Sequence, residues 1–165
     1  MEYVEVLLEK IAALPLWTGE EVQVLQDSVL FTVSGIGEMP DAHMIGEVRV
    51  VRREAPKSDW MVLRAMLARC SEGIRADLAN EKLYELTMNF RNGVFYLDDS
   101  GTLCVESSIP IIRDKSGSNV QLFYAQYTEL TDFLNIFYPY LLKVVTAPEE
   151  ASLQEYVSAL VTETE

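Results

Sequence analysis

Asp98, Asp99 and Ser100 are the nearest approach to a metal-binding or catalytic motif in this chain of 165 residues. Two carboxylates and a hydroxyl suit a hard cation, and a carboxylate also activates water for hydrolysis. A calcium loop needs ligands at several alternating positions, whereas Thr102 starts a strand pattern at once. Asp, Ser and Gly also favour tight turns. We therefore expect a hairpin turn, with a small metal-dependent hydrolase that uses Asp98 and Asp99 as the alternative.

The other residue types used in catalysis are scarce. His43 is the single histidine, and Cys70 and Cys104 lie 34 positions apart with no Cys-x-x-Cys motif. This is too little for a disulfide framework or a zinc site. Gly35 and Gly37 lack the third glycine of a dinucleotide-binding loop. The sequence therefore predicts a protein that is not an enzyme and that has no metal and no cofactor.

Charge is unevenly distributed along the chain. The formal net charge is −13, yet seven of the thirteen basic residues lie between positions 49 and 75, against three acids there. An acidic body repels nucleic acid, so a regulator that contacts nucleic acid through this basic segment is a minor alternative. The more specific interpretation is a docking surface for an acidic partner or for a second copy, with Arg49, Arg52 and Arg53 as candidate contacts.

No apolar run is long enough to span a bilayer, and the N-terminus carries acids where a signal peptide needs bases. We therefore expect no contact with a membrane and a location in the cytoplasm.

The spacing of apolar residues predicts alternating helical and strand segments. The expected elements are a helix over residues 2–14, strands over 28–34 and 45–53 joined by a loop at 35–43, a helix over 74–90, and a hairpin of strands 94–97 and 102–109. Residues 59–70 fit both periods, with a slight preference for helix.

A long helix is expected over residues 119–143, because Ser118 and Gln121 form a capping-box pattern. Pro139 should kink or break it near residues 135–138.

Thr146 and Glu149 repeat the capping pattern, with Pro148 in the first turn. A short final helix should follow, so that residues 146–165 form a helical extension of a single domain over residues 1–165.

Seven of the sixteen aromatic residues lie within residues 123–140. Those that continue the apolar stripe of the long helix should be in the core, and those off the stripe are candidates for a partner or dimer interface. The interface candidates are Tyr124, Phe133, Tyr138 and Tyr140.

The segment LTMNFRNGVFYLDDSGTLCVE, residues 86–106, resembles the YbjN-like family, which is similar in fold to the class I type III secretion chaperones. Both have a helix that leads through an asparagine-containing turn into a hairpin, and then a further helix that packs on the sheet. The resemblance is strongest over residues 74–142, about 40% of the chain. The chain departs from the family in the loop at residues 35–44 and in the helix after Pro148.

This resemblance implies that residues 59–70 are the third strand of an antiparallel meander, and we adopt the strand on that ground. It further implies a small acidic homodimer that binds segments of other proteins without nucleotide or catalysis. The expected fold is α+β, an antiparallel sheet with helices packed on it, in the order helix, three strands, helix, hairpin, long helix and C-terminal helix. The expected function is a chaperone-like adaptor or regulator.

Overall fold

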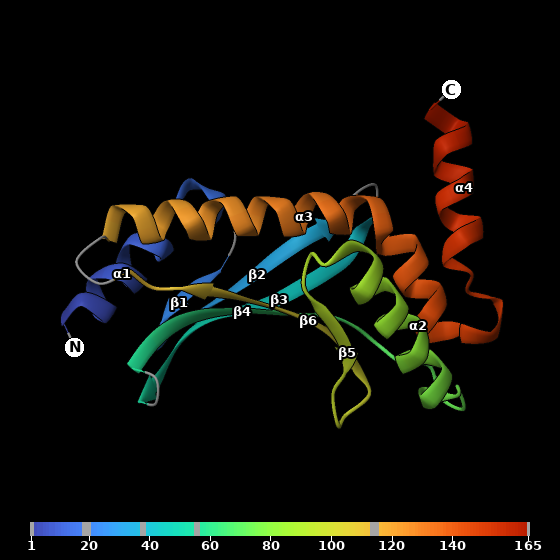
Figure 1. Ribbon diagram of the computed structural model, residues 1–165, viewed down its shortest axis with the longest axis horizontal. Helices are drawn as coiled ribbons and strands as arrows, with labels where there is room; N and C mark the ends of the chain where they lie inside the picture. The colour runs from blue at the N-terminus through green and yellow to red at the C-terminus, as the bar shows by residue number, and fades with distance from the viewer. Residues whose placement is uncertain (1, 18–20, 37–38, 55–56, 113–115, 165) are drawn as a thin grey trace.

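The computed structural model describes residues 2–17, 21–36, 39–54, 57–112 and 116–164, and it shows an α+β fold with a six-stranded antiparallel sheet (Figure 1). The described elements are, in order, α1 (Glu2–Ala12), the 3-10 helix η1 (Pro15–Trp17), β1 (Val22–Val24), β2 (Ser28–Ile36), β3 (Met39–Glu54), β4 (Lys57–Arg69), α2 (Ala76–Phe90), β5 (Val94–Leu97), β6 (Thr102–Pro110), α3 (Ser116–Thr146), the 3-10 helix η2 (Pro148–Glu150) and α4 (Leu153–Thr164). The expected α+β class and antiparallel sheet are confirmed.

The strands lie in the order β1-β2-β3-β4-β6-β5. β1 to β4 form a meander, and α2 then carries the chain past β6, which pairs with β4, while β5 forms the edge. Four strands therefore precede α2 rather than three, because residues 22–24 pair with β2. The strand prediction for residues 59–70 is confirmed, and the helix that periodicity slightly favoured there is wrong.

The prediction of a loop at residues 35–43 is wrong over part of its length. β2 continues to Ile36 and β3 starts at Met39, so that His43 lies in a strand, exposed and paired with Ser34. Gly37 and Glu38 lie outside the described residues. Gly and Pro indicated a loop here, but Gly35 lies in β2 and Pro40 lies in β3, because the two strands pair as far as Ile36 and Met39.

α1 and α3 lie on one face of the sheet, and their apolar side chains form the core with it (Figure 1). Alternate residues of β3 and β4 point to these helices and are all buried; we call them the covered face, and they are Met44, Gly46, Val48, Val50, Met61, Leu63, Ala65 and Leu67. Gly46 leaves room for the ring of Phe31, because a Cβ there would lie 2.1 Å from its Cζ. The core therefore depends on close packing at this glycine.

α2 lies along the free edge of β5 and closes it. Thr87 accepts a hydrogen bond from the Phe95 amide at 3.0 Å, and Asn80 accepts one from the Leu97 amide at 3.3 Å. An unpaired strand edge readily joins other chains, and side chains of a neighbouring helix satisfy it here.

α3 is one continuous helix of 31 residues with Pro139 inside it, and it bends toward its C-terminal end (Figure 1). The expected kink is present, and the alternative of a break is wrong. The helix starts at Ser116, before the predicted cap at Ser118. Asn119 is buried and bonds both the amide and the carbonyl of Ile112, at 2.9 and 2.8 Å, which fixes the incoming chain.

α4 confirms a helix after Pro148, with a different cap from the one predicted. Thr146 is the last residue of α3 and donates to the Leu142 carbonyl. Ser152 caps α4 by accepting from the Glu155 amide at 3.3 Å. The capping pattern at Thr146 was therefore misleading, because α3 extends to Thr146 and α4 starts only at Leu153.

None of the described helices combines the length and the apolar character that crossing a membrane requires.

Candidate functional site: the open face of the sheet

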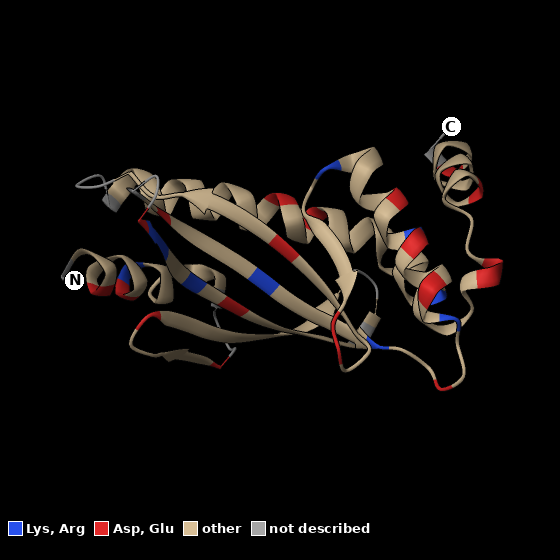
Figure 2. Cartoon of the chain, turned by 60° about the horizontal axis from the view of Figure 1, so that its bottom comes forward, with Lys and Arg blue, Asp and Glu red and all other residues tan. Residues whose placement is uncertain are grey.

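The face of the sheet opposite α1 and α3 is the candidate functional surface, and we call it the open face. Strand residues alternate between the two faces, so the register assigns its members. They are Ser28, Leu30 and Thr32 on β2, Ile45, Glu47, Arg49, Val51 and Arg53 on β3, Ser58, Trp60, Val62, Arg64 and Met66 on β4, Cys104, Glu106 and Ser108 on β6, and Val94 and Tyr96 on β5. Figure 2 shows this face without a helix over it.

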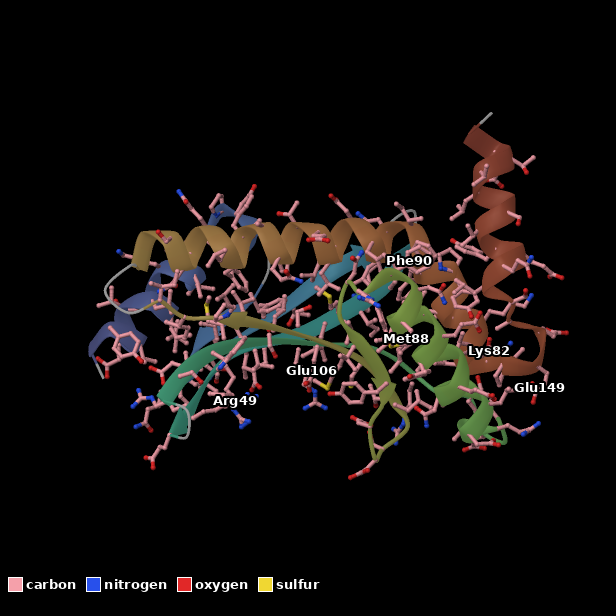
Figure 3. The ribbon with its side chains drawn as sticks, in the orientation of Figure 1. Arg49, Lys82, Met88, Phe90, Glu106 and Glu149 are labelled. Carbon is pink, nitrogen blue, oxygen red and sulfur yellow. The ribbon has the colours of Figure 1, made fainter. Side chains whose placement is uncertain are left out.

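Charged and apolar side chains are interspersed across the open face. Glu47, Arg64 and Glu106 are in register on β3, β4 and β6, so unlike charges are neighbours in this row. The next row toward the β3–β4 turn contains Arg49 and Val62. Arg49 and Glu106 point away from α3 (Figure 3). The face therefore carries both signs of charge close to apolar side chains.

Arg64 is the centre of a polar network. Its guanidinium lies 3.6 Å from the Asp98 carboxylate, 3.8 Å from that of Glu106 and 3.7 Å from the Cys104 sulfur. The Tyr96 hydroxyl donates to Glu106 at 2.5 Å, and burial together with this hydrogen bond raises the pKa of the tyrosine. The charge of Arg64 is thus balanced within the chain.

The Asp98 motif forms the expected hairpin turn. The Asp98 carboxylate accepts from the amide and hydroxyl of Ser100, at 2.9 and 2.7 Å, and from the Thr102 amide at 3.0 Å. The Ser100 hydroxyl and the Thr102 amide hold the pKa of this carboxyl below its ordinary value. Among the described residues, no group of three or more His, Cys, Asp or Glu side chains could hold a metal ion. Asp98 shapes the turn, and Asp99 is exposed beside it.

The two thiols differ in exposure but share one property. Cys104 is fully buried beneath the open face, and burial raises its pKa even though Arg64 opposes the shift. Cys70 is half-buried, and burial raises its pKa as well. Because the thiolate is the nucleophile, both sulfurs are weakly reactive at neutral pH.

The candidate arginines do not form one basic patch. Arg49 and Arg53 lie on the open face, where the Arg53 guanidinium lies 5.6 Å from the centre of the Trp60 ring. Arg52 points to the opposite side of the sheet, where its register partner on β4 is Asp59. It borders a hollow of about 430 Å³ that Glu5 and Asp27 also line. Strand alternation therefore divides a cluster that looks continuous along the chain.

The candidate aromatic residues are also divided. Tyr124 is 46% exposed and remains a candidate contact. Phe133, Tyr138 and Tyr140 are only 5, 4 and 3% exposed, so the expectation that they lie at the surface is wrong. Phe90 of α2 contacts the Phe133 ring, which also contacts Phe95 of β5, and Tyr156 of α4 contacts the Tyr140 ring.

Sequence reasoning missed the apolar part of the open face. Ile45 and Val94 are 50 and 56% exposed, and Trp60, Val62 and Met66 are half-buried. The sequence gives no clear signal for this part of the face, because residues 59–70 are largely apolar at successive positions and strand alternation cannot be read from them.

Comparisons with protein-family models, curated proteins and solved structures find no match to this chain. The resemblance to the YbjN-like family therefore remains an expectation from the sequence pattern.

Proposed function

We propose that this chain is a non-catalytic protein-binding module, a chaperone-like adaptor or regulator that binds another protein as a homodimer. The observation that carries the proposal is the open face, on which Ile45 and Val94 are about half exposed and Trp60, Val62 and Met66 are half-buried. Monomeric proteins rarely leave extended apolar surface in contact with water, and such surfaces usually bind other proteins.

The arrangement of polar groups agrees with binding rather than chemistry. Asp98 is engaged by its own turn, Cys104 is buried, and Arg64 is balanced by two carboxylates. Such a network stiffens the sheet and presents its face in one conformation. Binding would then proceed by mass action on a preformed surface.

α3 also carries exposed apolar side chains, but they do not form one patch, because residues two positions apart on a helix point to opposite flanks. Leu122, Tyr124 and Ile136 are 40 to 50% exposed, on the side of the sheet opposite the open face. A homodimer that uses the open face leaves these side chains for a protein partner. We also propose a location in the cytoplasm, and two free cysteines agree with a reducing compartment.

Light scattering after size-exclusion chromatography tests the homodimer. We expect a mass twice that of the 18.7 kDa chain at tens of micromolar. A monomer at that concentration would refute this part of the proposal.

Suppression of client aggregation tests the chaperone-like part. At equimolar ratio the chain should reduce the turbidity of a chemically denatured, aggregating protein, and Tyr124→Ser should weaken that effect. Thr162→Ala, on exposed α4, is the matched control. If the wild-type chain leaves the turbidity unchanged, the chaperone-like function is wrong.

A further inference from the structure

We propose that the open face is the homodimer interface, on which a second copy of this chain packs face to face. The two-fold axis lies in the plane of the interface, runs perpendicular to the strands and crosses β3 between Glu47 and Arg49. This inference rests on the homodimer proposed above and adds its surface and its register. A two-fold interface joins the same patch of both subunits, so the patch must be complementary to itself.

The charges on β3 select the position of the axis. Glu47 and Arg49 are successive side chains on the open face, because the intervening Val48 points into the core. A two-fold axis midway between them reverses the order of the rows, so Arg49 lies over Glu47 of the partner subunit. Symmetry repeats the contact, which gives two ion pairs. An axis through either residue would place like charges on each other.

The same rotation pairs the apolar side chains. The rows at equal distances on either side of the axis are those of Val51 with Trp60 and of Ile45 with Met66. Trp60 therefore lies over Met66 of the partner subunit, and Val51 lies over Ile45 of the partner subunit. A large aromatic ring against flexible methionine is typical of the centre of a protein interface.

Arg64 does not oppose this packing. In the dimer, Arg64 lies over Val62 of the partner subunit. An isolated cation buried against an apolar side chain would carry a high free-energy cost. Arg64 has two carboxylates of its own chain within 4 Å, Asp98 and Glu106. It therefore enters the interface with its charge already balanced.

The size of the face suits a stable dimer. With about 4.8 Å between strands and about 3.3 Å per residue, a face roughly five strands wide and about nine residues long covers about 700 Å². Two such faces bury roughly 1,400 Å², which is the size of a standard specific interface. Face-to-face sheets pack with their strands nearly aligned, as this axis requires.

Charge reversal with rescue tests the interface. Glu47→Arg and Arg49→Glu should each raise the dimer dissociation constant about 100-fold, because each change creates two like-charge contacts. The double variant should return to within about tenfold of wild type, since it restores both pairs with the signs exchanged. Analytical ultracentrifugation measures the constants.

A mixture of the two single variants gives an independent readout. Every acid of one chain then faces a cation of the other, so a heterodimer should form at concentrations at which each variant alone is monomeric. Glu129→Arg and Lys143→Glu are the matched controls, since both are exposed on α3 and change the net charge equally. Circular dichroism and the urea midpoint verify that each variant is folded.

The outcomes distinguish this inference from the homodimer itself. If the wild type is a dimer and neither single reversal weakens it, the open face is not the interface although the homodimer stands. If both reversals weaken the dimer and neither the double variant nor the mixture restores it, the proposed axis is wrong. A wild type that is monomeric at tens of micromolar refutes both.

Discussion

The covered and open faces of the sheet are built by the same strands and differ in what limits their side chains. On β3, Val48 and Val50 of the covered face are at most 7% exposed, whereas Ile45 of the open face is 50% exposed. The covered face packs against α1 and α3, so size and shape decide which residues fit. The open face has no such neighbour among the described elements, and its charges and apolar groups remain available to a partner.

This difference separates stability from recognition within single strands. Substitutions on the covered face should change the free energy of unfolding, and those on the open face should change association. Neighbouring residues on one strand therefore provide matched pairs of variants.

Leu63 and Val62 make the most direct test of this separation. Leu63→Ala should lower the free energy of unfolding by about 3 to 4 kcal/mol, because a fully buried side chain leaves a cavity. Val62→Ala, on the half-buried open side, should lower it by less than about 1 kcal/mol. Urea unfolding of the monomer measures both. Equal losses would show that both faces are packed.

Gly46 and Ile45 test the same contrast by adding and removing volume. In Gly46→Ala the new Cβ would lie 2.1 Å from Cζ of Phe31, whose ring is held edge-on by Tyr127 at 5.9 Å. The expected loss is about 2 to 3 kcal/mol. Ile45→Ala should cost less than about 1 kcal/mol. A Gly46 variant with wild-type stability would mean that the Phe31 ring moves freely.

Tyr140 tests a polar atom in the core. Its hydroxyl is buried, and no hydrogen-bond partner for it lies within the described part of the chain. Burial raises its pKa to about 12, above about 10 in an unfolded chain. The folded state therefore binds the Tyr140 proton more tightly than the unfolded state does. The stability that this tighter binding contributes is complete below about pH 10 and is lost as the pH rises through 12.

Tyr140→Phe should raise the free energy of unfolding by about 1 kcal/mol at pH 7, because an unmet buried hydroxyl is removed. It should also reduce the loss of stability between about pH 10 and 12. Urea titrations at several pH values measure both effects, with Tyr124→Phe as the exposed control. An unchanged alkaline profile would contradict the assignment.

Thr87 tests the closure of the β5 edge. Thr87→Val removes the acceptor of the Phe95 amide and the donor to the Leu83 carbonyl, and should cost about 1 kcal/mol. Hydrogen exchange at the Phe95 amide should become faster. Thr162→Val, which removes only a bond to the Ser158 carbonyl, should leave that exchange unchanged.

Local patterns were sufficient for several elements. The helix at residues 74–90 has a clear apolar stripe, and the Asp98 turn is specified by the side chain that accepts its own backbone amides. Both depend on residues close in the chain, so the sequence predicts them well. Ser152 and Glu155 also form a capping pattern, which was missed because Thr146 and Glu149 offered the same signal earlier.

Residues 59–70 show where local patterns fail. Their apolar side chains fit a helix as well as a strand, and pairing with β3 on one side and β6 on the other decides for the strand. These partners lie up to about fifty residues away, so no local period contains the information. The resemblance of residues 86–106 to a known hairpin arrangement supplied it instead.

Three properties follow from the amino-acid pattern: residues 45–53 have two unlike faces, Asp98 begins a turn, and catalytic residue types are scarce. The packing of distant elements was needed to show which face is covered, that Arg52 lies apart from Arg49, and that Phe133, Tyr138 and Tyr140 are buried. Side-chain spacing follows from the local backbone period, whereas burial depends on remote elements such as α2 and α4 that pack against a side chain.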